Sequence, residues 1–331
     1  MASERNIAKE KILIIRFSSI GDIVLTTPIV RALKNQGNYC IHYLIKEKFK
    51  HVLDGNEHLE KIFCFEDEEL KSKLQQEKYS LVIDLQNNLK SLMIRKNLSK
   101  KTYVVNKENL KKLLLVRTGI DLLNQEHIVT RYFKTIKKLG IKDDGMGLDF
   151  FIPKDFGIPQ EKTPIELDKP FVTWVIGASY PKKTLTELQI AGVCSTLNMP
   201  FVLLGGPLDK KRGDLIESLC QKDNTYNLCG KLSLQESAFF VKKSALVLTN
   251  DTGMMHIAAA MQKQIISFWG CTKPSLGMYP FRAGQESIML VSETNKAPCS
   301  KLGNRCKSSR TGCIKDISEE TITKSINKLL R

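Results

Sequence analysis

The chain has 331 residues, 42% of them hydrophobic, which is enough for two packed α/β domains of ordinary size. Its formal net charge of +16 attracts nucleic acid, anionic lipid or phosphorylated small molecules. No run approaches the roughly 18 apolar residues of a membrane span, residues 1–11 lack the apolar core of a signal peptide, and nine scattered cysteines fit a reducing compartment better than a disulfide framework.

Short apolar runs alternate with helical stretches, which predicts parallel sheets built from β-α-β units. In the first half of the chain the expected strands lie near 11–16, 40–45, 61–65, 80–85 and 102–105. A helix is expected from Ile23 to Lys34, with Pro28 inside it. Another amphipathic helix is expected from Glu126 to Leu139 and is ended by Gly140.

Helix-breaking residues between 153 and 170 mark a linker between two domains. They are Pro153, Gly157, Pro159, Pro164 and Pro170. Strands are expected again at 171–176, 201–204, 246–248 and 264–269, and a final helix begins near Ser318. We therefore expect one domain over 1–155, a second over 170–315, and a C-terminal helix over 316–331.

The stretch from Asn250 to Ala260 follows a buried strand-like run and begins a helix rich in small residues. A strand, a polar turn and a helix present free backbone N–H groups and the positive end of the helix dipole to an anion. Gly253 would let a ligand approach the backbone closely. The pattern predicts a phosphate site, and the alternative is an ordinary helix cap with His256 as a buried structural side chain.

The chain begins with a similar unit, in which a strand-like run over 11–16 is followed by a glycine-containing loop and a helical pattern. Open α/β sheets bind ligands at such turns. The G-x-G-x-x-G fingerprint is absent, so NAD and FAD are disfavoured and no cofactor is expected. Asp22 lies at the helix start, either as an N-cap or as a carboxylate aimed into the crevice at the edge of the sheet.

Four segments match, in order, one family of enzymes: Ile14 to Pro28, Asp84 to Ser91, Gly177 to Lys183, and Asn250 to Ala260. Together they resemble glycosyltransferase family 9, the heptosyltransferases that build the lipopolysaccharide inner core. The resemblance implies the α/β GT-B fold, in which two Rossmann-like domains with parallel sheets face each other across a cleft. It also implies that the final helix packs back on the first domain. It implies inverting transfer of heptose from ADP-heptose to a phosphorylated glycolipid of the Kdo–lipid A type. The resemblance also implies a cytoplasmic location, peripheral at the inner face of the inner membrane.

The same resemblance assigns roles to individual positions. Asp22 is expected to be the general base on the acceptor hydroxyl, and Lys183 is expected to neutralise charge on the departing diphosphate, with Lys182 as its neighbour. The other expected donor-binding residues are Ser179, Tyr180, Asp209, Asp251, Thr252, Gly253 and His256. The expected acceptor-binding residues are Ser19, Gly21, Asn88, Lys90 and Ser91. For His256 a structural role is preferred, and Asp209 either contacts the ribose or lies in a solvated turn.

Two features bear on metal ions. No Asp-x-Asp pair appears, so the transfer is expected to need no metal. Cys299, Cys306 and Cys313 recur at seven-residue spacing in a basic segment. A zinc site would need a fourth ligand, and this spacing is not a usual zinc motif, so unpaired structural thiols are the favoured interpretation.

Basic residues gather between 90 and 138, without a helix-turn-helix, zinc-finger or RNA-binding aromatic motif. We therefore expect an anionic membrane surface and a phosphorylated glycolipid as partners, and no nucleic acid. Two alternatives stay open. One is a family relative that uses another nucleotide sugar or acceptor, and the other is a non-catalytic nucleotide-sugar-binding module.

Overall fold

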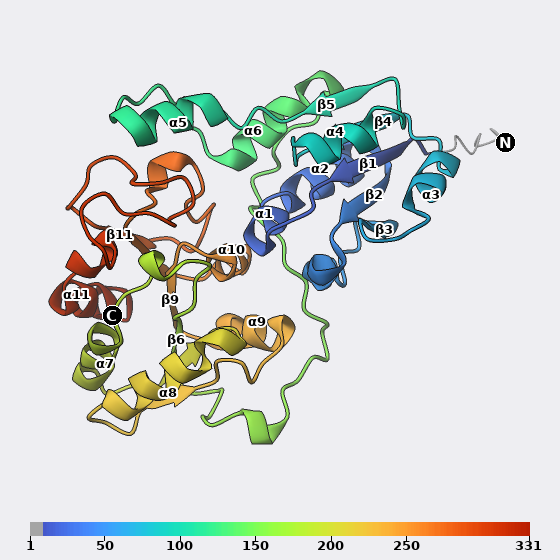
Figure 1. The fold of residues 1–331 in the computed structure, drawn as a ribbon. Coiled ribbons are helices and arrows are strands. Elements are labelled where there is room, and N and C mark those ends of the chain that lie inside the picture. The colour runs from blue at the N-terminus through green and yellow to red at the C-terminus, as the bar shows by residue number, and fades with distance from the viewer. Residues whose placement is uncertain (1–8) are drawn as a thin grey trace. The chain divides into compact units, whose positions relative to one another are not determined.

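The computed structural model describes residues 9–331, and most of residues 1–11, where no signal peptide is expected, lies outside this range. The chain divides into two compact units (Figure 1). The first contains the residues up to Lys107 together with Ile128–Met146, and the second contains Glu108–His127 and Gly147–Arg331. No helix within residues 9–331 has the length and apolar character needed to cross a membrane.

A five-stranded parallel sheet forms the centre of the first unit. Its strands are β1 (Lys11–Ile15), β2 (Cys40–Ile45), β3 (Lys61–Cys64), β4 (Leu81–Asp84) and β5 (Thr102–Val104). They are ordered β3-β2-β1-β4-β5, and each neighbouring pair is parallel. The strands are apolar runs rather than alternating ones because helices cover both faces of such a sheet. Chain order reverses between β1 and β4, which makes the ends of these two strands the expected ligand-binding edge.

The helices of the first unit follow the strands in the expected rhythm. They are α1 (Ile20–Val24), α2 (Thr27–Gly37), α3 (Leu70–Gln76), α4 (Leu89–Arg95) and α6 (Ile128–Thr135), with 3-10 turns η1 (Glu47–Leu53) and η2 (Lys137–Leu139). The single helix expected over 23–34 is two helices, because Pro28 lies in the first turn of α2, where its missing N–H costs no hydrogen bond. The helix expected over 126–139 ends earlier and continues as the 3-10 turn before Gly140.

The second unit contains a six-stranded parallel sheet. Its strands are β6 (Val172–Val175), β7 (Phe201–Leu204), β8 (Thr225–Asn227), β9 (Leu246–Asn250), β10 (Ile265–Trp269) and β11 (Ile288–Val291). The order is β11-β10-β9-β6-β7-β8, and every neighbouring pair is parallel. The sequence did not predict β8, which is short and polar, or β11, which is half-exposed. Chain order reverses between β6 and β9, so a second ligand-binding edge is expected there.

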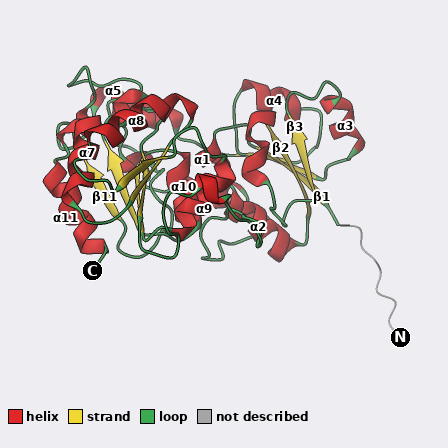
Figure 2. Ribbon diagram, turned by 90° about the horizontal axis from the view of Figure 1, so that it is seen from below, coloured by secondary structure: helices red, strands yellow, loops and turns green. Residues whose placement is uncertain are grey.

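The second unit contains helices as well (Figure 2). They are α5 (Asn109–Thr118), α7 (Glu187–Thr196), α8 (Lys210–Leu219), α9 (Leu234–Lys243), α10 (Gly253–Ala260) and α11 (Glu319–Leu329). The 3-10 turns are η3 (Gln160–Lys162), η4 (Pro181–Lys183), η5 (Pro207–Asp209), η6 (Pro274–Leu276) and η7 (Cys313–Asp316).

Two segments belong to a different unit from the one that the sequence predicts for them. The segment 108–127 lies with the second unit, where Leu115 and Leu123 bury against Leu276. Helix α11 was expected to pack on the first domain. Its buried side chains Ile322 and Ile326 lie instead in the core of the second unit. Two Rossmann-like α/β units with parallel sheets confirm the predicted fold class.

Candidate active site

The end of β1 carries the first candidate carboxylate. Asp22 lies in the first turn of α1, and its side chain is 24% exposed. One carboxylate oxygen pairs with the Arg16 guanidinium, and the other accepts hydrogen bonds from the Ser19 backbone N–H at 3.1 Å and from the Ser19 hydroxyl at 2.9 Å. These contacts fix the carboxylate at the edge of the sheet while leaving part of it accessible. Ser19 is exposed and Gly21 is buried.

Arg16 holds the turn between β1 and α1 in place. Its side chain is buried and donates to the carbonyl oxygens of Ser18 at 2.9 Å and Leu85 at 2.7 Å. Burial raises the pKa of the Asp22 carboxyl, but the Arg16 charge, the Ser19 hydrogen bonds and the charge of Lys107 lower it further, so the net pKa lies below the usual value. Asp22 is therefore ionised at neutral pH and able to accept a proton.

The end of β4 is braced by a buried carboxylate. Asp84 is fully buried and accepts hydrogen bonds from the backbone N–H of Asn87 at 2.7 Å and from the Ser91 hydroxyl at 2.8 Å. Asn88 caps α4 by accepting from the Ser91 N–H at 2.9 Å. Ser91 is fully buried and its hydroxyl donates to Asp84, so in this structure Ser91 stabilises the turn between β4 and α4. Lys90 is exposed, with its ammonium 5.3 Å from the centre of the Phe65 ring.

The second unit brings two predicted donor residues together at the ends of β6 and β9. The Lys183 ammonium lies 2.7 Å from a carboxylate oxygen of Asp251, and their side chains are 12% and 15% exposed. The Thr272 hydroxyl donates to the same oxygen at 2.8 Å. Asn250, the last residue of β9, donates its side-chain amide to the Ile176 carbonyl oxygen at 3.0 Å and so ties the two strand ends together. Asp251 thus holds Lys183 in place rather than capping a helix.

Helix α10 begins directly after this ion pair. Thr252 is its N-cap residue, has extended backbone dihedrals and makes no side-chain capping bond. Backbone N–H groups in the first turn, beginning with Gly253, have no partner within the helix and point toward its N-terminal end. A cation and a helix N-terminus therefore lie beside one another, which is the arrangement that binds a phosphate group. His256 is 2% exposed, so it lies inside the fold.

The remaining predicted donor residues surround the end of β6. Asp209 accepts from the Gly206 N–H at 2.8 Å, and its carboxylate lies so close to Gly177 that a Cβ there would be 2.3 Å away. Ser179 is exposed, Tyr180 and Lys182 are half-buried, and all three precede Lys183 in the same loop. The structure therefore places Asp209 against the loop that carries Lys183.

Sequence reasoning missed three residues that complete these sites. Arg16 directly follows the apolar strand β1, and a charge at that position was a usable signal. Thr272 follows β10, the strand beside β9, and only the sheet order shows that it reaches Asp251. Cys271 joins Cys299, Cys306 and Cys313, whose four sulfur atoms all lie within 4.8 Å of one another.

The chain is similar to known proteins over nearly its whole length. The chain is 25% identical to lipopolysaccharide heptosyltransferase 1 of Campylobacter coli, over 96% of this chain and 98% of that protein. A glycosyltransferase family 9 structure from Veillonella parvula has a TM-score of 0.79 at 21% identity, covering 97% of each chain. The Escherichia coli heptosyltransferase WaaC, solved with ADP, has a TM-score of 0.71 at 17% identity, covering 97% of this chain and 100% of that one.

These structural similarities support the GT-B fold. The model of glycosyltransferase family 9 (heptosyltransferase) matches residues 68–309, a range that takes in β4, the linker and the Lys183–Asp251 pair. That range is well over half of the 331 residues. The chain therefore belongs to glycosyltransferase family 9, the heptosyltransferases.

Proposed function

We propose that this glycosyltransferase moves heptose from ADP-heptose to a lipopolysaccharide inner-core acceptor of the Kdo–lipid A type, with inversion at the anomeric carbon. The observation that carries the proposal is the Lys183–Asp251 pair beside the N-terminus of α10, at the point where strand order reverses. The names of similar proteins support the sugar and its nucleotide carrier. One is a lipopolysaccharide heptosyltransferase, and a structural neighbour was solved with ADP.

The donor end of the proposal rests on charge. A nucleoside diphosphate gains negative charge as the glycosidic bond breaks, and preorganised cations and N–H donors stabilise that charge. Lys183 supplies the cation, and Thr252 and Gly253 supply the helix N-terminus. Ser179, Tyr180, Lys182 and Asp209 line the same strand ends as further donor contacts. Since this stabilisation comes from the protein, we propose that the chemical step needs neither a metal ion nor a cofactor.

The acceptor end rests on Asp22. As the acceptor oxygen attacks the anomeric carbon, its proton passes to the Asp22 carboxylate and the bond to the diphosphate breaks, releasing ADP. Arg16 keeps this carboxylate ionised and oriented. Ser19 and Gly21 from the same turn, and Asn88, Lys90 and Ser91 at the end of β4, are the proposed acceptor-side residues. Of these, buried Ser91 acts through Asn88.

The proposed glycolipid acceptor requires access to a lipid surface. The segment 108–127 carries apolar side chains that the described structure leaves exposed, namely Leu110, Leu113, Ile120 and Leu122. Basic Lys111 and Arg117 lie among them. Apolar and basic side chains together bind anionic membrane surfaces. We therefore propose a peripheral position at the inner, cytoplasmic face of the inner membrane, and no role in binding nucleic acid.

A donor comparison tests the proposal. Calorimetry with ADP, UDP and GDP should give the tightest binding for ADP, and transfer to a heptose-free inner-core acceptor should occur with ADP-heptose alone. Efficient transfer from a UDP or GDP sugar would instead identify a family relative with another donor. ADP binding without transfer to any acceptor would identify a non-catalytic module.

A further inference from the structure

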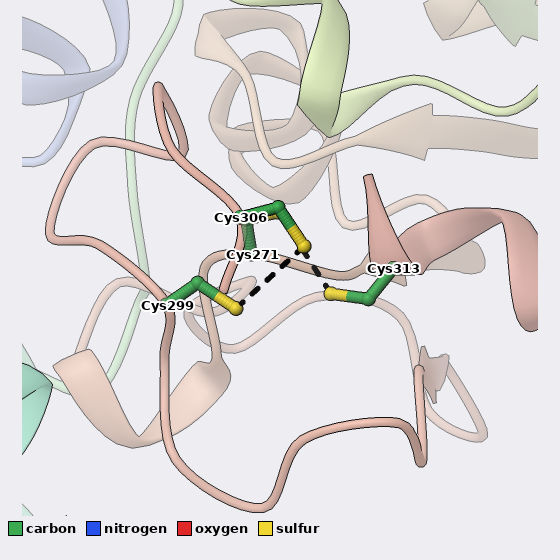
Figure 3. A group of neighbouring side chains, drawn as sticks. All are labelled: Cys271, Cys299, Cys306 and Cys313. Atoms are coloured by element: carbon green, nitrogen blue, oxygen red, sulfur yellow. Dashed lines mark hydrogen bonds between the residues drawn. The ribbon is translucent and has the colours of Figure 1, made fainter. Parts of the chain in front are cut away.

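Four cysteine side chains converge in the second unit. Cys271 follows β10, Cys299 and Cys306 lie in the loop 292–312, and Cys313 begins η7. Three of them are buried, and Cys306 is half-buried. Figure 3 shows the four side chains pointing toward one another from separate segments.

Two of the distances between the sulfur atoms match those of a tetrahedral thiolate site, and all four atoms lie within 4.8 Å of one another. Zinc–sulfur bonds of about 2.3 Å in a tetrahedron place the sulfur atoms about 3.8 Å apart. The Sγ atoms of Cys271 and Cys313 are 3.8 Å apart, and those of Cys299 and Cys306 are 3.9 Å apart. A disulfide would need about 2.05 Å. Because four sulfur atoms surround one point, the chemistry fits zinc or mononuclear iron rather than magnesium or calcium.

The surroundings suit the charge of such a site. Four thiolates around a divalent ion leave a net charge of about −2. The segment 294–315 contains no Asp or Glu and carries the basic residues Lys296, Lys301, Arg305, Lys307, Arg310 and Lys315. The side-chain amide of Asn295 donates to the Cys299 sulfur at 3.4 Å. Outer N–H groups of this kind orient metal-bound ligands.

The loop that carries two of these cysteines has little regular structure to hold it. Residues 292–312 contain no helix or strand in the described chain. A loop of this length without regular structure is uncommon inside a compact domain unless it is functional or is held by other means. Metal binding supplies folding free energy to such segments.

We propose that Cys271, Cys299, Cys306 and Cys313 bind one metal ion, zinc or iron, through four thiolates. With all four ligands supplied by the chain, the ion keeps no open position for substrate, so its role is structural. It joins the end of β10, the loop 292–312 and the start of η7 into one body. This replaces the interpretation of unpaired thiols, which rested on three cysteines without Cys271.

Residues next to the proposed metal site contact the Lys183–Asp251 pair at two points. A Cβ on Gly303, in the same loop, would lie 2.5 Å from Cγ of Lys183, so the loop backbone lies against the stem of that lysine. Thr272, the neighbour of Cys271, donates to Asp251. This step rests on the proposed role of Lys183 in binding the donor diphosphate. The metal ion therefore positions the Lys183 ammonium, and the ion itself does not contact the diphosphate.

The loop also supports α5. Lys301 donates to the side chain of Asn109, and Lys307 donates to the carbonyl oxygen of Val116. Loss of the ion should therefore loosen both the Lys183 loop and the helix that carries exposed leucines.

Elemental analysis of the full-length protein, purified without added metal or chelator, tests the proposal. We expect about one zinc or iron ion per chain. Iron bound by thiolates absorbs visible light and zinc does not, so the spectrum identifies which ion is present. Titration of the native protein with a mercurial should release the metal as the thiols react. None of these readouts depends on sugar transfer, so this proposal and the proposed function can fail separately.

Matched variants locate the ion. Cys271→Ser and Cys306→Ser should lose most of the metal and melt at lower temperature, whereas Cys64→Ser, in the first unit, should keep the metal. Should the cluster variants fail to fold, the analysis of the parent protein still decides the question. A parent protein that contains neither ion and takes up neither under reducing conditions would overturn the proposal. Disulfides joining these cysteines, or metal retained in Cys271→Ser, would do the same.

Discussion

Replacing Lys183 by alanine should weaken ADP binding and slow transfer. The ammonium is held 2.7 Å from Asp251, and its side chain is only 12% exposed, so it is positioned before the donor arrives. A hydrogen bond to a charged group contributes about 1.5–3 kcal/mol, which corresponds to about a 10- to 150-fold rise in the ADP dissociation constant. The loss also leaves the Asp251 carboxylate with Thr272 alone, and its repulsion of the diphosphate acts in the same direction.

Isothermal titration with ADP measures this effect directly. Lys211→Ala, which removes an exposed lysine from α8, is the matched control and should bind ADP as the parent does. Melting temperatures of both variants show whether the unpaired Asp251 destabilises the fold. If Lys183→Ala remains folded and binds ADP as tightly as the parent, the diphosphate lies elsewhere, and the reasoning from the β6 and β9 strand ends is wrong.

Three further predictions follow from the same geometry. Asp22→Asn should slow transfer about 10²- to 10⁴-fold while ADP binding is unchanged, with exposed Asp54→Asn as control, and near-parental turnover would exclude Asp22 as the base. Transfer assayed in EDTA without added divalent metal should keep its rate while elemental analysis shows the four-cysteine ion still bound; activity that is lost and then restored by magnesium or manganese would contradict the leaving-group chemistry. Gly303→Ala should reduce the affinity for ADP, because Gly303 has a φ of +78° and a Cβ there would press on the Lys183 side chain. Gly157→Ala, with open space around it, should not. Equal ADP affinities of the two variants would show that the loop 292–312 does not position the donor site.

Both candidate sites could be found from the sequence because their signals are local. A strand, a polar turn and a helix occur within a few residues of each other around Asp22 and around Gly253. The parallel sheets followed from apolar runs that alternate with helices. The two helices at 20–37 could not be separated by periodicity alone, because apolar residues continue up to the break, which lies between Val24 and Thr27.

The contacts that complete the sites depend on sheet order, which the sequence does not show. Lys183 meets Asp251 because β6 and β9 are neighbours, although β7 and β8 lie between them in the chain. Thr272 reaches Asp251 because β10, which precedes Cys271 and Thr272 in the chain, lies beside β9. Cysteine spacing in the sequence therefore could not show the four-cysteine cluster, since Cys271 comes from a separate strand end rather than from the loop 292–312.

Product analysis tests the central claim most directly. The protein is incubated with ADP-heptose and a heptose-free Kdo–lipid A acceptor, and the product is examined by mass spectrometry and by NMR of the new anomeric centre. We expect an acceptor heavier by one heptose, linked with inverted configuration, and ADP released in equal amount. An unchanged acceptor, or a product with retained configuration, would contradict it.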